Sequence, residues 1–231
     1  MSARLLTLAF HDARLQYRYG IYAAYAFVLA FYIAVLVGAG PYLPAWAPGL
    51  IIFTDPAALG FFFLGALMML EKSERIRAAL GVAPISPFDY LAGKVITLTG
   101  MAVISSAILV LFIHEPANPA LLLLAVGLTS IMYVGIGVPI ALRFRTVNGY
   151  MIGSSGFLIP LIAPGFVALL DPTPAWAMVL PATSQFKLIL VAAGAGSASA
   201  IEIAFMLLVV AAAAVAALAL ALHYLRRELG R

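Results

Sequence analysis

A serine and a histidine form the pair in this chain with the clearest potential for catalysis. Ser155 lies in the stretch Gly153-Ser154-Ser155-Gly156, and His223 ends the last apolar run. A serine activated by a histidine is a common nucleophile, and in apolar surroundings it would belong to an intramembrane serine protease. Small residues at this spacing are more often packing contacts between membrane helices, and no second histidine or asparagine is placed to bind an oxyanion. An intramembrane serine protease that uses Ser155 and His223 is therefore kept only as an alternative function for this chain.

Metal binding and ion coupling find less support in the ionisable residues. The chain has no cysteine, which excludes disulfides and thiolate metal sites, and its three histidines are scattered through the sequence. Four acidic residues border apolar runs: Asp55, Glu115, Asp171 and Glu202. Ion-coupled carriers usually keep ionisable residues in the middle of the membrane. Because these four are expected at the ends of spans, coupling through a buried carboxylate is not predicted.

The segments that must position these residues are apolar enough to form a membrane domain. Of 231 residues, 65% are apolar and 10% charged, whereas soluble domains average about 45–50% and about 25%. This composition excludes a soluble enzyme and a disordered chain. Six apolar runs each approach the roughly 20 residues that a spanning helix needs. They cover residues 22–39, 49–70, 95–113, 119–142, 150–170 and 201–222.

These runs are continuous rather than alternating, which predicts helices and not the strands of a barrel. Residues 1–231 are therefore expected to form a single all-α transmembrane domain with six membrane-spanning helices. Inside the second run, Thr54-Asp55-Pro56 is predicted to start the helix, with a capping residue and a proline at the first position.

The distribution of basic residues predicts the orientation of the spans. Twelve of the 13 Lys and Arg residues lie in the N-terminal segment, the second-to-third loop, the fourth-to-fifth loop or the C-terminal tail. Lys187 is the one basic residue of the other loops. Because basic loops stay on the cytoplasmic side, both termini are expected in the cytoplasm of a multi-pass protein of the cell membrane. Topology explains the basic excess, so nucleic-acid binding is not predicted.

Three segments outside the spans carry further information. Residues 1–20 fit an amphipathic helix lying in the membrane surface, with Phe10 and Tyr17 on its apolar side and Arg14 on its polar side. Residues 71–94 form the longest cytoplasmic loop. Residues 171–200 form a long outer loop, in which residues 183–193 are expected to make a short re-entrant or interfacial helix capped by Thr183 or Ser184.

The cytoplasmic loop has the features of a docking element. Ser86 and Pro87 fit the cap and first position of a short helix over residues 87–93, with Asp89 in its first turn. Phe88 and Tyr90 have no obvious place in a core, which favours contact with a soluble partner. A plain helix-turn-helix connection is the simpler interpretation.

Together these features resemble the membrane subunit of an ABC-2 type exporter, including those of the drug-export kind. The resemblance rests on the in-plane helix, the six spans, the broken outer segment and a loop pattern of a glutamate, a Pro-x-Ser turn and a Gly-Lys pair. The matching loop residues are Glu71, Pro84, Ser86 and Lys94.

The resemblance implies that residues 71–94 hold a coupling helix that rests on a separate cytoplasmic ATPase subunit. The docking residues would be Glu71, Glu74, Pro84, Ser86, Phe88, Asp89 and Tyr90. It also implies a second permease subunit, as a homodimer or a heterodimer. The sequence contains no G-x-x-x-x-G-K-[ST] phosphate-binding loop. ATP and Mg are therefore expected on the partner ATPase, with no cofactor and no enzymatic activity in this chain.

Polar residues on the apolar spans are candidates for a substrate pathway. They are Thr97, Ser105, Thr129 and Tyr133. Serine and threonine in membrane helices more often bond to the backbone or to a neighbouring helix. The lack of charge in the middle of the spans favours a lipophilic or amphiphilic cargo over a small ion.

Overall fold

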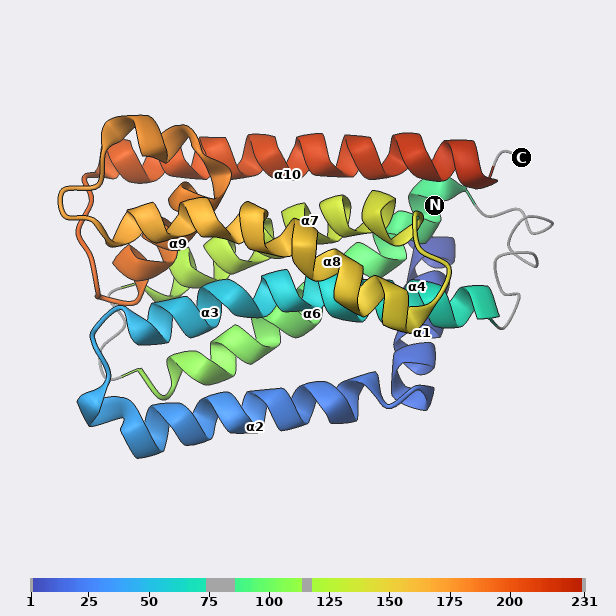
Figure 1. Ribbon diagram of the computed structural model, residues 1–231, viewed down its shortest axis with the longest axis horizontal. Helices are drawn as coiled ribbons and strands as arrows, with labels where there is room; N and C mark the ends of the chain where they lie inside the picture. Colours follow the sequence, from blue (N-terminus) through green and yellow to red (C-terminus); the bar gives the residue numbers. More distant parts are fainter. Residues whose placement is uncertain (1, 74–85, 114–117, 230–231) are drawn as a thin grey trace.

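Long helices lie side by side along most of the chain in the computed structural model, which describes residues 2–73, 86–113 and 118–229 (Figure 1). No strand occurs in these described ranges. The elements are α1 (Ser2–Arg18), α2 (Ile21–Ala39), η1 (Gly40–Tyr42), α3 (Ala47–Ala58), η2 (Leu59–Phe63), α4 (Leu64–Ser73), α6 (Pro87–Val110), α7 (Pro119–Ala141), α8 (Val147–Ile162), η3 (Ala163–Leu169), η4 (Ala175–Val179), α9 (Pro181–Ala192) and α10 (Ala200–Leu229).

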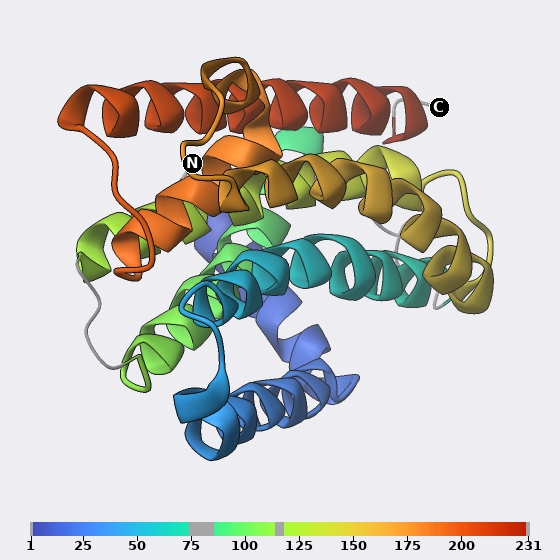
Figure 2. The same cartoon turned by 60° about the vertical axis from the view of Figure 1, so that its left-hand side comes forward.

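Six helical segments are long and apolar enough to cross a membrane, which confirms the predicted all-α, six-span architecture. They are Ile21–Ala39, Ala47–Lys72, Pro87–Val110, Pro119–Ala141, Val147–Leu169 and Ala200–Glu228. Both chain termini lie at one end of the bundle, as an even number of crossings requires, and α1 runs across that end (Figure 1). We call this the terminal end. In both overall views α2 and α10 lie on opposite sides of the bundle (Figure 2).

The second span begins earlier than the sequence predicts. The helix starts at Ala47 with Pro48 in its first turn, so the predicted start at Thr54-Asp55-Pro56 is wrong. Pro56 lies inside α3, where a proline removes a backbone donor and crowds the preceding turn. The chain remains helical because it widens into the π-helical turn η2 directly after α3. A position expected at the membrane surface is therefore inside the span.

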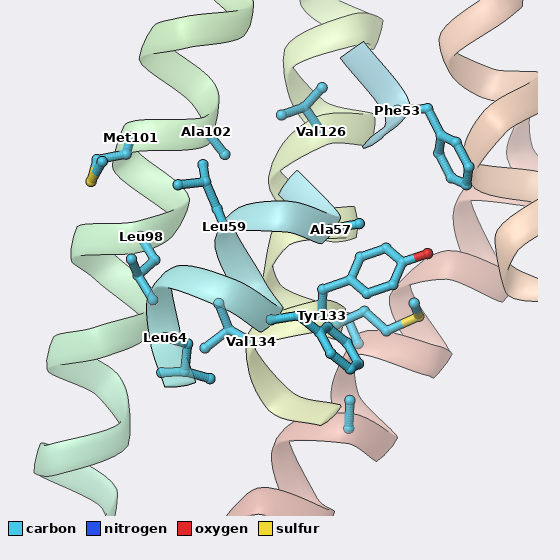
Figure 3. Close-up of a cluster of buried hydrophobic side chains, with 14 of the residues drawn as sticks. Phe53, Ala57, Leu59, Leu64, Leu98, Met101, Ala102, Val126, Tyr133 and Val134 are labelled. Atoms are coloured by element: carbon cyan, nitrogen blue, oxygen red, sulfur yellow. The ribbon is translucent and has the colours of Figure 1, made fainter. Parts of the chain in front are cut away.

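The core lies where this second span crosses α7. An added Cβ at Gly60 would lie 2.6 Å from the Cβ of Tyr133, and one at Gly137 would lie 2.2 Å from the carbonyl oxygen of Gly60. Glycine at both positions lets the two backbones approach closely. Side chains from α3, η2, α4, α6 and α7 then close around the contact (Figure 3). Those labelled include Leu59, Leu64, Leu98, Met101, Ala102, Val126 and Val134.

The fifth span is fixed against η2 by one tyrosine. Thr146 caps α8 by accepting a hydrogen bond from the backbone N–H of Gly149. One turn later, the hydroxyl of Tyr150 donates to the carbonyl oxygen of Phe61 at 2.5 Å. The ring of Tyr150 fits there because Gly65 has no side chain. The irregular turn of the second span is therefore also the attachment point of α8.

The short helix expected at residues 183–193 is α9, but its predicted caps are wrong. Leu180 precedes it without a side-chain hydrogen bond, and Pro181 occupies the first turn. Thr183 donates instead to the carbonyl oxygen of Pro164, and Ser184 to that of Met178. Both hydroxyls thus attach α9 to the neighbouring η3 and η4 segments.

Candidate functional site

A buried ionic cluster joins α1, α4 and α6 at the terminal end of the bundle. The ammonium nitrogen of Lys94 lies 3.0 Å from Oδ1 of Asp12 and 2.5 Å from Oε1 of Glu71. Lys94 is only 1% exposed, and both carboxylates are buried as well. We call the cluster the charged junction. It consists of Asp12, Gln16, Glu71, Tyr90, Lys94 and Thr97.

Local helix geometry places the α6 members of the junction. The Ser86 hydroxyl caps α6 by accepting a hydrogen bond from the backbone N–H of Asp89, and the Asp89 carboxylate accepts one from the backbone N–H of Ser86. The helix therefore begins at a defined residue. Tyr90 and Lys94 are four residues apart and therefore share one face of α6. The hydroxyl of Tyr90 donates to Oε2 of Glu71 at 2.6 Å, and the Lys94 ammonium lies 4.7 Å from the centre of the Tyr90 ring. Both oxygens of Glu71 are thereby engaged.

The α1 side of the junction was not anticipated from the sequence. Asp12 and Gln16 are also four residues apart, and the side-chain amide of Gln16 donates to Oδ2 of Asp12 at 2.8 Å and to the hydroxyl of Thr97 at 2.9 Å. The Thr97 hydroxyl in turn donates to Oδ2 of Asp12 at 2.6 Å. Phe10 and Tyr17, assigned to the apolar side of the helix, are exposed on the bundle surface, as a side that faces lipid would be. The buried face of α1 is mixed: Asp12 and Gln16 are buried together with Leu15, whereas Arg14 of the predicted polar side is exposed.

The junction is suited to a mechanical rather than a chemical role. It contains two carboxylates and one ammonium, without a serine or histidine to act as nucleophile or base. Breaking one partner of a buried ion pair leaves an uncompensated charge and costs about 3–5 kcal/mol. The three helices are therefore expected to move together when one of them is displaced.

The residues predicted for docking have different positions. Phe88 is 50% exposed at the start of α6, whereas Tyr90 is buried in the junction. The expectation that Tyr90 has no place in a core is therefore wrong. Ser86 and Asp89 form the helix cap, and Glu71 closes the junction from α4. Glu74 and Pro84 lie outside the described residues.

The four candidate pathway residues lie between packed helices. Thr97 belongs to the junction, and Ser105 donates to Oδ2 of Asp55 at 2.7 Å. Thr129 donates to the carbonyl oxygen of Ala125 on its own helix. Tyr133 is fully buried, and its hydroxyl points away from Leu98 and Met101 (Figure 3). Their place on a substrate pathway stays a prediction.

Asp55 corrects the expectation that no ionisable residue lies inside a span. It is the ninth residue of α3, about 12 Å along the helix at 1.5 Å per residue, and it is buried. Its Oδ2 accepts hydrogen bonds from Tyr25 at 2.5 Å and from Ser105 at 2.7 Å. Tyr25 is one of only three buried residues on α2. Asp55 thus provides the main polar attachment of α2 to the bundle.

The geometry does not support the serine protease. The hydroxyl of Ser155 donates to the carbonyl oxygen of Met151 on its own helix, at 3.1 Å. The exposed ring of His223 contacts the ring of its neighbour Tyr224. No hydrogen bond joins Ser155 to His223 within the described ranges. Those ranges also contain no group of three or more metal-ligating side chains.

Comparison with known proteins shows that the sequence is similar to those of export permeases. Two proteins named "Fluoroquinolones export permease protein", from Mycobacterium tuberculosis strains CDC 1551 and H37Rv, are each 26% identical over 157 residues. The match covers 68% of this chain and 66% of each relative, slightly less than two thirds of their length. No family model and no solved structure matches the chain. The resemblance to drug-export permeases predicted from the sequence is confirmed by these relatives.

Proposed function

We propose that this multi-pass protein of the cell membrane, a relative of drug-export permeases, is the membrane-spanning subunit of an ATP-driven ABC exporter. A separate ATPase subunit would bind ATP and Mg and hydrolyse the nucleotide. A second permease subunit, identical or different, would complete the pathway. The cargo would be lipophilic or amphiphilic, and the name of the relatives makes fluoroquinolones the first compounds to test.

The position of the charged junction is the observation that carries this proposal. Glu71 begins the expected coupling loop, residues 71–94, and Ser86 and Lys94 lie in its second half. The Lys94–Glu71 pair joins the end of α4 to the start of α6, and the Lys94–Asp12 pair adds α1. A partner that displaced the loop would therefore move three helices together. This is how hydrolysis in another subunit could be coupled to motion of the spans.

Phe88 is the described residue best suited to touch such a partner. It is half-exposed, and the reciprocal Ser86–Asp89 cap fixes the helix turn from which it projects. Aromatic side chains that fill a pocket of a partner often account for much of the binding free energy. Tyr90, two residues further and therefore on the opposite, inner face of α6, would then act on Glu71 and not on the ATPase.

The decisive experiment is co-purification followed by an ATPase assay. The tagged chain is extracted from its native membrane, its partners are identified by mass spectrometry, and the complex is reconstituted in vesicles. We expect a stoichiometric chain with a phosphate-binding loop and ATP-dependent uptake of a fluoroquinolone into inverted vesicles. Phe88→Ala should weaken partner binding by roughly tenfold, the scale of a moderate interface contact.

Tyr42→Ala is the matched control, because Tyr42 is a strongly exposed aromatic residue on η1, away from the terminal end. It should leave binding and uptake unchanged. A chain that purifies alone and moves no fluoroquinolone in an ATP-dependent way would refute the proposal. Peptide cleavage by the wild type, lost in Ser155→Ala, would then revive the protease.

A further inference from the structure

A polar cavity lies at the end of the bundle opposite the termini. Its volume is about 350 Å³, inside the roughly 300–1,000 Å³ range of small-molecule sites. It lies between α9, the start of α10 and the segment that joins η3 to η4. Its lining includes Asp171, Thr173, Met178, Lys187, Ser199 and Glu202. Side chains of both charges therefore face the same space.

Lys187 is the unusual member of this lining. It is only 8% exposed, and in the described part of the chain its ammonium has no hydrogen bond and no ion pair. The ammonium nitrogen itself is not among the fully buried polar atoms of the described residues, so it opens into the cavity, where an anionic group can contact it. The buried amine of Lys94, which contacts two carboxylates, shows the arrangement that would satisfy it. Lys187 thus lacks an anionic partner that the cavity has room to accept.

One carboxylate of the cavity, that of Glu202, interacts electrostatically with Lys187 without forming an ion pair. Oε2 of Glu202 accepts a hydrogen bond from the backbone N–H of Ser199 at 2.7 Å, which fixes the side chain at the start of α10. Asp171 lies across the cavity lining on the exposed segment after η3. Neither carboxylate is ion-paired with Lys187. Opposite charges that border one cavity without meeting suit a ligand that carries both.

We propose that this cavity binds a zwitterion, with its anionic oxygen group on Lys187 and its protonated amine on Asp171 and Glu202. Two sources share this chemistry: the head group of phosphatidylethanolamine and a small zwitterionic solute. The proposal goes beyond the export function, because binding here requires neither the ATPase nor transport.

Binding is tested on the purified full chain with probes that differ in one charge. In native mass spectrometry, phosphatidylethanolamine competes with phosphatidylglycerol, which lacks the amine, and with phosphatidylcholine, whose quaternary amine donates no hydrogen bond. In calorimetry, norfloxacin, which carries both charges, is compared with its ethyl ester, which lacks the carboxylate. Preference for phosphatidylethanolamine identifies a lipid site, and preference for norfloxacin over its ester identifies a solute site. Equal binding within both comparisons would overturn the proposal.

Variants separate ligand binding from a structural role of the lysine. Lys187→Met should weaken binding of the preferred probe by about tenfold or more, the scale of one charge-assisted hydrogen bond, whereas Lys187→Arg should retain it. Lys72→Met, at an exposed lysine of α4, should leave binding unchanged. Without ligand, Lys187→Met should melt at the same temperature as the wild type or higher, because the substitution removes no hydrogen bond or ion pair of the described residues. A lower melting temperature with unchanged binding would show a structural lysine and refute the site.

Discussion

Lys94 is the residue on which the terminal end of the bundle depends. Its ammonium contacts both Asp12 and Glu71. We expect Lys94→Met to lower the free energy of unfolding by about 3–5 kcal/mol, because two buried carboxylates would then lack a cation. The measurement is thermal unfolding of the purified chain in detergent. Lys72→Met provides a control at an exposed lysine, with an expected change within about 0.5 kcal/mol.

A second substitution distinguishes loss of charge balance from loss of packing. In the wild type, Asp12→Asn removes one ion pair and should destabilise the chain. In the Lys94→Met background the same change removes an unpaired negative charge and should stabilise it. If Asp12→Asn destabilises both backgrounds equally, the two residues are not coupled and the charged junction does not act as one unit.

Sequence patterns anticipated some junction residues and missed others for a clear reason. Glu71 and Lys94 were identified through the loop pattern of the resembled family. Asp12 and Gln16 were not, because an amphipathic pattern assigns the buried face to the apolar residues. In a membrane surface that rule can reverse, since apolar side chains such as Phe10 can face lipid while polar ones pack inward. Asp55 was missed because its place depends on where the second span begins.

At the scale of elements, the contact between α4 and α8 gives a sharp prediction. A Cβ added at Gly65 would lie 1.9 Å from Cε1 of Tyr150, inside a packed core. We expect Gly65→Ala to destabilise the chain by about 1–3 kcal/mol, because the ring must shift and lose its bond to Phe61. Gly100→Ala is the matched control on α6, where an added Cβ meets nothing within 4 Å. It should be neutral or stabilising, since alanine favours helix over glycine.

Thermal unfolding of both glycine variants in detergent measures this difference. Equal melting temperatures for Gly65→Ala and Gly100→Ala would mean that the close approach of α8 to α4 is absent. A smaller side chain at position 150 offers a further check. Tyr150→Leu should reduce the harm of Gly65→Ala, because the obstructing ring atoms are gone, although it also removes the hydrogen bond to Phe61.

Hydropathy predicted the spans well, but it did not predict how they begin and end. Both Pro48 and Pro56 fit the first turn of a helix, and the wrong one was chosen for the second span. A π-helical turn that accommodates an internal proline has no local signature in the sequence. The caps of α9 were also misassigned, because Thr183 and Ser184 donate to backbone carbonyls of η3 and η4 and not to the first turn of their own helix. Such contacts depend on tertiary packing.

At the scale of the whole molecule, the fold sets both termini at one end, and the charge rule predicts which side that end faces. Twelve of the 13 basic residues belong to the segments expected inside the cell. The chain contains no cysteine, so a single introduced thiol reports its own location without background. Exposed sites suited to this are Asn148 in the first turn of α8 and Ser197 before α10, which lie at opposite ends of the bundle.

We expect Ser197→Cys to react with a membrane-impermeant maleimide in intact cells, and Asn148→Cys to react only after the membrane is opened. Impermeant reagents reach only the outer surface, and hydrocarbon about 30 Å thick separates the two positions in a six-span bundle. The opposite labelling pattern would mean that the chain crosses the membrane in the opposite orientation. The charged junction would then face outward, beyond the reach of a cytoplasmic ATPase, and the cavity around Lys187 would face the cytoplasm. Labelling of both thiols in intact cells would instead show that the bundle does not separate its two ends across a membrane.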